Sequence, residues 1–140
     1  MDILPQTPEM VVSDWDYFAH AIKTTARKVG ESYTADQVYQ VALNGDASVF
    51  YVYEDGVRRG LLVLTDYVDK YTSKTVLHVD IAYLTGPKLI HELEVLINQI
   101  VNEHQFDRFE FRSPRKGWFK YLTAAGFEAS ATFSKEFNYG

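Results

Sequence analysis

The sequence predicts one α/β or α+β domain in which a mixed, mostly antiparallel sheet is flanked by helices. The hydrophobic period alternates along the chain, giving the order helix, helix, three strands, helix, strand, helix, strand, or ααβββαβαβ. A strand followed by a crossover helix and another strand favours a right-handed unit with parallel neighbours. The chain has 140 residues, of which 46% are hydrophobic, so it fits one core and a single domain over residues 1–140.

The first helix is predicted to begin after Thr7 and to run towards Lys28. Thr7 offers a side-chain acceptor at the N-cap position, Pro8 suits the first helical position, and Glu9 places an acid in the first turn. Gly30 follows as the stop signal.

A second, shorter helix is predicted to open at Thr34 and to close at Asn44-Gly45. Thr34 and Gln37 have the spacing of a capping box, in which each side chain bonds the other residue's backbone amide. Glycine after asparagine is typical of a helix end.

Three antiparallel strands in a meander are predicted next, because apolar and polar residues alternate and turn residues interrupt the alternation. These strands are predicted at residues 48–53, 57–68 and 75–84. Helical spacing returns from Lys88 to His104 with one apolar stripe. The remaining elements are predicted as a strand from Arg108 to Phe111, a helix from Pro114 to Ala125 stopped by Gly126, and a strand from Ala131 to Phe137.

Composition excludes several classes of function. The chain has no cysteine, and its four histidines show no metal-ligand spacing, so thiol chemistry and a metal site are not expected. A formal charge of -5 argues against general nucleic-acid binding. The sequence has neither a membrane-spanning apolar run nor the start of a signal peptide, so we expect a cytoplasmic protein.

One short segment departs from the acidic average. It concentrates positive charge within 13 residues, at Arg108, Arg112, Arg115, Lys116 and Lys120. Such a segment suits a phosphate of a cofactor, a nucleic acid or an acidic patch on another protein. A solvated helix face accounts for the same pattern equally well.

The order of elements resembles that of the GNAT fold, the Gcn5-related N-acetyltransferases, over nearly all of the chain. The segments TPEM and VYEDGVRRG and the dipeptide Gly117-Trp118 are similar, in the same order, to small GNAT-like proteins encoded by bacteriophages. The resemblance implies an N-acyltransferase that uses acetyl-CoA or another acyl-CoA. It also implies a location in the host cytoplasm or in the virion.

The family's pyrophosphate motif, Arg/Gln-Gly-x-Gly-x-Gly/Ala, falls on residues 85–90, where only Gly86 matches. Pro87 has no amide donor, so the resemblance implies a degenerate loop in which Lys88 restores some positive charge. A tight strand-to-helix turn explains the same residues without a cofactor. The candidate cofactor-binding residues are Ile81, Ala82 and Tyr83 for the pantetheine arm, and Thr85, Gly86 and Lys88 for the phosphates.

Strand alternation places His78 and Asp80 on one face with Ala82, and Ile81 with Tyr83 on the other. His78, charged or oriented by Asp80, could act as the base that removes an ammonium proton. A wet strand face, or two buried residues with structural partners, is the alternative.

The resemblance also implies a tyrosine acid four residues before the Gly126-Phe127 that ends the last helix. That position holds Leu122, and Tyr121 lies one residue earlier, about 100° around the helix. We keep Tyr121 as a candidate acid, with packing as its alternative role.

Two functions follow from these observations. One is an acyl-CoA-dependent N-acyltransferase. The other is a catalytically inactive GNAT-fold module that binds a host or virion protein, as a structural component of a phage particle or an inhibitor of a host factor. Aromatic residues make up 15% of the chain, which suits interfaces as well as cores.

Overall fold

The computed structural model describes residues 2–86, 89–111, 119–130 and 133–139. Within these ranges five strands form one sheet in the order β1-β2-β3-β4-β5. The first four strands pair antiparallel, and β4 pairs parallel with β5. The strands are β1 (Asp2–Gln6), β2 (Ser48–Glu54), β3 (Val57–Val68), β4 (Thr75–Leu84) and β5 (Arg108–Phe111).

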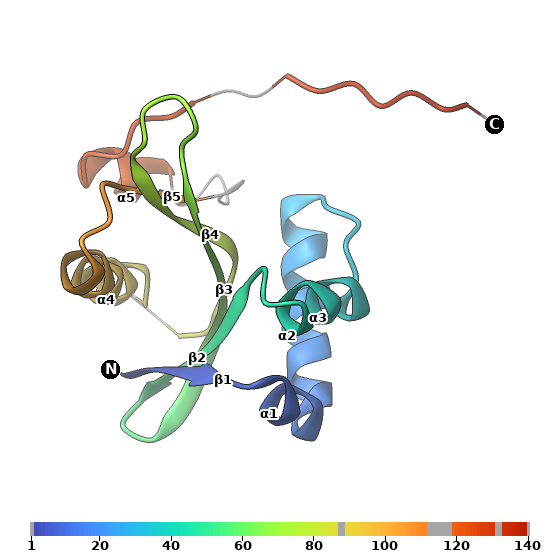
Figure 1. The fold of residues 1–140 in the computed structure, drawn as a ribbon. Coiled ribbons are helices and arrows are strands. Elements are labelled where there is room, and N and C mark those ends of the chain that lie inside the picture. Colours follow the sequence, from blue (N-terminus) through green and yellow to red (C-terminus); the bar gives the residue numbers. More distant parts are fainter. Residues whose placement is uncertain (1, 87–88, 112–118, 131–132, 140) are drawn as a thin grey trace.

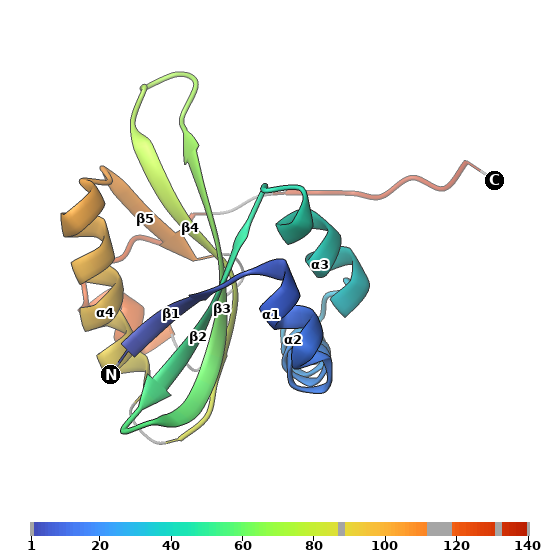
Figure 2. The same ribbon diagram turned by 60° about the horizontal axis from the view of Figure 1, so that its bottom comes forward.

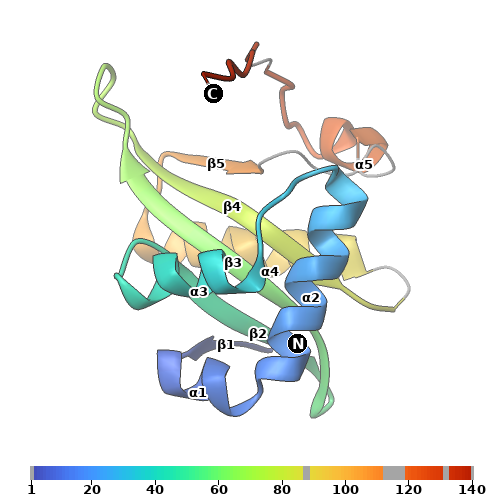
Figure 3. The same cartoon turned by 90° about the vertical axis from the view of Figure 1, so that its right-hand side faces the viewer.

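Helices cover both faces of the sheet. Three of them, α1 (Pro8–Ser13), α2 (Trp15–Val29) and α3 (Ala35–Leu43), lie on one side, and α4 (Leu89–His104) lies on the other (Figures 1 and 2). Figure 3 shows α2 crossing over β4, with α3 beside it. The fifth helix in the described residues, α5 (Phe119–Ala124), follows β5. This arrangement confirms the predicted mixed, mostly antiparallel sheet flanked by helices.

The two helical layers enclose separate apolar clusters. On the side of α2, Phe18 and Ile22 pack with Leu61, Val63 and Ile81 of the sheet. On the side of α4, the buried members are Val52, Leu62, Leu64, Leu77, Val79 and Ile97. Burial on both faces explains why the central strands are rich in branched apolar residues.

The N-terminal region differs from the prediction in two ways. The expected single helix is two, because the chain departs from helical geometry at Asp14, with φ -127° and ψ 44°. Residues 2–6 form a strand that the sequence did not predict, an edge strand in which Pro5 is tolerated. The second helix is as predicted, with the capping box between Thr34 and Gln37 formed on both sides.

The C-terminal half is partly as predicted. The strand at Arg108–Phe111 is confirmed, and α4 matches the predicted helix from Leu89 onwards, while Lys88 lies outside the described residues. The helix predicted from Pro114 to Ala125 is described as α5 from Phe119 to Ala124, and residues 114–118 lie outside the described residues. Gly126, with φ 92°, comes shortly after the end of α5.

The last predicted strand is wrong for residues 133–137, which form no strand, and residues 131–132 lie outside the described part. The segment extends away from the body of the domain in Figure 1, so its backbone gains no ladder partner. Its aromatic side chains gain no burial there, since Phe133 is 97% exposed and Tyr139 is 94% exposed.

No helix among the described residues combines the length and apolar character required to cross a membrane.

Candidate functional site

The parallel pairing of β4 with β5 stops halfway along β4. It runs from Val76 with Arg108 to Val79 with Phe111, where β5 ends. From Asp80 to Leu84, β4 continues with β3 as its strand partner among the described residues. The two strands are therefore hydrogen-bonded at one end only, and this half of β4 presents a backbone edge that β5 does not cover.

A β-bulge marks the point where this pairing stops. Val63 of β3 pairs with Ile81, but the next residue, Leu64, pairs with Val79, which leaves Asp80 as the extra residue of β4. A bulge bends its strand and redirects the side chains that follow it. Asp80 therefore lies directly after Val79, the last residue of β4 that pairs with β5.

The bulge corrects the predicted faces of β4. Ile81 packs with the cluster under α2, and Tyr83 lies against the same cluster, on the side that carries His78. Ala82 instead packs against the cluster under α4, with Leu77 and Val79. Strict alternation was the wrong assumption because one inserted residue reverses every side chain beyond it.

The sheet face under α2 carries a set of polar side chains that we call the His78 network. Its members are His78, Asp80, Glu110, Thr65 and Tyr67. The imidazole Nδ1 lies 2.8 Å from Oε1 of Glu110, and Nε2 lies 3.4 Å from Oδ1 of Asp80. Tyr67 donates a hydrogen bond of 2.6 Å to the same Oε1 of Glu110, and Thr65 donates to Asp80. The structure thus brings together His78 and Asp80, two of the three predicted catalytic residues, and adds three partners.

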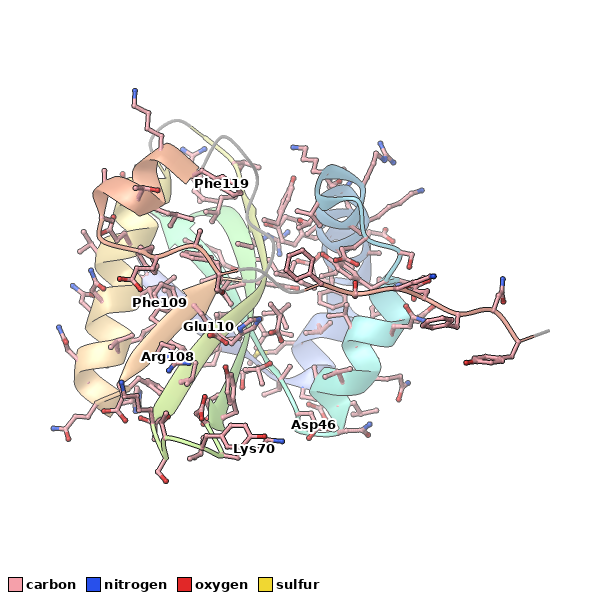
Figure 4. The ribbon with its side chains drawn as sticks, turned by 90° about the horizontal axis from the view of Figure 1, so that it is seen from above. Asp46, Lys70, Arg108, Phe109, Glu110 and Phe119 are labelled. Atoms are coloured by element: carbon pink, nitrogen blue, oxygen red, sulfur yellow. The ribbon has the colours of Figure 1, made fainter. Side chains whose placement is uncertain are left out.

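Backbone pairing explains the positions of these partners. Thr65 is paired with His78 across β3 and β4, and Glu110 is paired with His78 across β4 and β5. Residues opposite one another in a sheet project from the same face, so three strands deliver their polar groups to one place. Figure 4 shows Glu110 and Arg108 on β5, with Phe109 directed to the opposite side, towards α4.

Glu110, Thr65 and Tyr67 were not among the site residues predicted from the sequence. The signal that could have found Glu110 was its alternation with the apolar Phe109 and Phe111, together with the prediction that this strand lies parallel beside β4.

The hydrogen bonds of the network shift the pKa values of Glu110 and Tyr67. Burial raises the pKa of Glu110, but the hydrogen bonds from Tyr67 and His78 outweigh it, and the pKa lies below the usual value. The hydrogen bond to Glu110, with burial second, raises the pKa of Tyr67. Glu110 is therefore an ionised acceptor at neutral pH, and Tyr67 is a neutral donor.

The turn after β4 is held against β3. The Thr85 amide and hydroxyl both donate to the carbonyl of Arg59, at 2.8 and 2.9 Å. Gly86 follows with φ 102°, in the region that favours glycine. A Cβ on Gly60 would lie 2.2 Å from the Tyr83 carbonyl, so glycine there permits the close approach of β3 to the end of β4.

Three parts of the predicted site are not described. Pro87 and Lys88 lie outside the described residues, and so does the side chain of Tyr121, whose backbone belongs to α5. Of the basic segment, Arg112, Arg115 and Lys116 also lie outside. Arg108 forms an ion pair of 3.7 Å with Asp69, so its charge is partly balanced within the chain.

An aromatic cluster that the sequence did not predict lies on the sheet face covered by α2 and includes Tyr83 of β4. The guanidinium carbon of Arg58 lies 3.5 Å from the ring centroid of Tyr17, and Arg58 also bonds to Asp14. The Tyr17 ring contacts those of Tyr51, at 5.5 Å, and Tyr83, at 6.2 Å. Burial raises the pKa of both Tyr17 and Tyr51 to about 12, with Arg58 acting in the opposite direction.

The residues present suit part of a CoA molecule. The part of β4 that β5 does not cover suits the amides of a pantetheine arm, and Gly86, with φ 102°, follows it. The sequence of the turn removes one donor at Pro87. The His78 network supplies ionisable groups next to the start of that part of β4. These are the features of the described residues against which a CoA site can be judged.

Comparisons with known proteins show the fold. No family model matches the sequence. No curated protein matches it either. Among solved structures, the chain is similar to a ribosomal-protein-alanine N-acetyltransferase from Brucella melitensis biovar Abortus 2308, with 17% identity, 100% coverage of both chains and a TM-score of 0.64.

Two other solved structures are also similar to this chain. One is an aminoglycoside acetyltransferase from an uncultured soil metagenomic sample in complex with sisomicin, with 13% identity, coverage of 98% of this chain and 96% of that chain, and a TM-score of 0.67. The other is a possible acetyltransferase from Clostridium difficile 630, with 9% identity, coverage of 99% and 98%, and a TM-score of 0.69. Identities this low establish architecture and not activity, and the architecture of this chain is the GNAT fold.

Proposed function

We propose that this protein is an acyl-CoA-dependent N-acyltransferase with a weakened pyrophosphate loop. The observation that carries the proposal is that the pairing of β4 with β5 ends at Val79, so that from Ile81 to Leu84 β3 is the strand partner of β4 among the described residues. This part of β4 leads directly into the Gly86 turn and α4. The acetyltransferase names of the similar structures support the reaction class.

In this proposal, backbone groups of Ile81, Ala82 and Tyr83 bind the pantetheine amides. Thr85, Gly86 and Lys88 meet the phosphates, where the N-terminal end of α4 adds a favourable dipole. Acetyl-CoA or another acyl-CoA supplies the thioester carbonyl carbon when bound. No member of the site needs a metal ion.

The chemistry transfers an acyl group to an amine. His78, beside Asp80, takes a proton from the acceptor's ammonium group, and the freed nitrogen lone pair forms the C–N bond. The C–S bond breaks with its electron pair on sulfur, the nitrogen loses its second proton, and the thiolate takes up one proton. The products are an amide, a CoA thiol and one released proton. Tyr121 is the candidate donor to the thiolate.

Release of free thiol tests this proposal directly. The chain has no cysteine, so any thiol that appears with acetyl-CoA and a panel of amines comes from the donor. We expect thiol release with at least one amine, and we expect it to fall at least about 100-fold in His78→Gln, the size of a lost general base. The absence of heat on titration with acetyl-CoA at millimolar concentration would contradict CoA binding itself.

A non-catalytic, protein-binding GNAT-fold module is the second candidate, and one observation favours it. Phe133, Phe137 and Tyr139 of the C-terminal segment are 97%, 66% and 94% exposed, and exposed aromatics are typical of interfaces. We propose in this case a bacteriophage protein that binds a virion or host component, in line with the sequence segments named above.

Two assays distinguish the candidates. A partner that co-purifies with the full chain, and is lost when residues 133–140 are removed, supports the binding module. Turnover of acetyl-CoA by the purified chain would contradict a purely non-catalytic role.

A further inference from the structure

We infer that Glu110 on β5 positions the His78 imidazole with a proton on Nδ1, which leaves Nε2 as the atom that accepts a proton. The purpose of this arrangement rests on the proposed acyl transfer. The arrangement itself is a property of the folded chain and can be tested without a substrate.

The tautomer follows from the chemistry of the partner. Nδ1 lies 2.8 Å from Oε1 of Glu110. An ionised carboxylate has acceptor atoms only, so the hydrogen of this bond belongs to the imidazole. The lowered pKa of Glu110 keeps the carboxylate ionised at neutral pH. Nδ1 therefore carries a proton whether the ring is neutral or charged.

Glu110 is itself held in place. The Tyr67 hydroxyl donates to the same Oε1 at 2.6 Å, from β3 on the far side of β4. Pairing of His78 with Glu110 fixes the two Cα atoms across the parallel strands. The imidazole is thus oriented by a carboxylate that has its own hydrogen-bond partner, a pattern that holds a base in one orientation.

The other ring nitrogen faces the bulge. Nε2 lies 3.4 Å from Oδ1 of Asp80, and Thr65 donates to the other carboxylate oxygen. The side chain of His78 is 19% exposed, so the ring is partly shielded from water. The neutral ring presents its lone pair at Nε2, next to the residue where the open edge of β4 begins.

The proton step is balanced in this geometry. An N–H bond of the acceptor's ammonium group breaks, its electron pair stays on the amine nitrogen, and the proton binds Nε2 of His78. The resulting imidazolium lies between two carboxylates, with Nδ1–H still bonded to Glu110. Loss of the Nε2 proton to water returns the ring to its starting tautomer. Glu110 is a positioning residue here and does not take part in the transfer.

Nitrogen-15 NMR of the full chain tests the assignment. The four imidazoles belong to His20, His78, His91 and His104, and the His78→Gln spectrum identifies the ring in question. At a pH where this ring is neutral, we expect the Nδ1–H form to predominate. In Glu110→Ala we expect that predominance to be lost, and Glu110→Leu repeats the test with a second residue that cannot accept a hydrogen bond.

Glu103→Ala is the matched control, because Glu103 is exposed on α4, which lies on the opposite side of the sheet from the His78 network (Figure 1). It should leave the His78 tautomer unchanged. If the chain turns over acetyl-CoA, Glu110→Ala should lower kcat at least about tenfold with little change in KM, as expected for a group that orients a base.

The outcomes separate the two proposals. A neutral His78 in the Nε2–H form, or an Nδ1–H form that survives both Glu110 substitutions, would overturn the positioning role. An Nδ1–H form that depends on Glu110, in a chain that neither binds nor turns over acetyl-CoA, would support the positioning role and contradict the acyltransferase.

Discussion

The carboxylate of Glu110 makes the stability of the fold depend on pH in the acidic range. Its pKa in the folded chain lies below the ordinary value of 4.5, because hydrogen bonds from Tyr67 and His78 outweigh the effect of burial. A lowered folded pKa stabilises the fold at pH values above the unfolded pKa, and this contribution is lost as the pH falls through the folded value.

We therefore expect Glu110→Ala to lower the free energy of unfolding at pH 6 and to lower it progressively less below about pH 4.5. Urea titrations of both proteins across this range measure the difference. Glu103→Ala, at an exposed position on α4, is the control variant for the loss of a carboxylate outside the network. A Glu110 difference that stays constant down to pH 2.5 would show that the carboxylate is not the cause.

Tyr17 and Tyr51 make the stability of the fold depend on pH in the alkaline range. Burial raises the pKa of Tyr17 and of Tyr51 to about 12, above the ordinary value of 10.0. A raised folded pKa contributes stability that is complete below pH 10 and is lost as the pH rises towards 12.

A spectrophotometric titration of tyrosinate should show Tyr17 and Tyr51 ionising late, near pH 12. Tyr17→Phe and Tyr51→Phe should each remove one late step, whereas Tyr71→Phe, at an 86% exposed position, should leave the steps of Tyr17 and Tyr51 in place. Ten tyrosines that ionise together near pH 10 in the folded protein would contradict the packing of this cluster.

Some strands and helices could be predicted from local sequence patterns alone. The capping box of α3, the meander of β2 to β4 and the parallel β5 depend on spacings of a few residues, which the sequence displays. The bulge at Asp80 depends on the pairing of β4 with β3, and the helix break at Asp14 coincides with its bond to Arg58 of β3. Such tertiary contacts leave no local signal, so the faces of β4 were predicted incorrectly beyond Asp80.

The turn between β4 and α4 offers a test of the phosphate site. Gly86 has φ 102° and Gly56, in the turn before β3, has φ 77°, so alanine is strained at both positions. Each substitution should cost on the order of 1 kcal/mol of stability. We expect Gly86→Ala to weaken acetyl-CoA binding in calorimetric titration and Gly56→Ala to leave it unchanged. Equal affinities for the two variants would contradict a phosphate site at Gly86.

Removal of the C-terminal segment tests whether residues 133–137 pair with the sheet, as the sequence pattern predicts, or form no strand, as in the structure. Residues 133–139 are exposed and form no strand, so a chain that ends at residue 132 should keep its free energy of unfolding within about 0.5 kcal/mol. Denaturant titration of the two chains makes the comparison. A loss of several kcal/mol would show instead that the segment pairs with the sheet, as the sequence pattern predicts.

The domain as a whole combines a predictable architecture with an unpredictable site. The order of elements predicted the GNAT fold because alternating periods and a right-handed crossover leave few topologies for one core. The partners of His78 come from β3, β4 and β5, and their meeting depends on register, which no single segment encodes. His78 and Asp80 could be chosen from the sequence, but Glu110 required the sheet.

Backbone amide NMR with acetyl-CoA added to the full chain shows whether the part of β4 that β5 does not cover binds an acyl-CoA. We expect the largest chemical-shift changes at Ile81 to Gly86 and in the first turn of α4, with little change in β1 or α3. Unchanged amide shifts along this part of β4 at millimolar acetyl-CoA, or changes confined to other elements, would contradict this expectation.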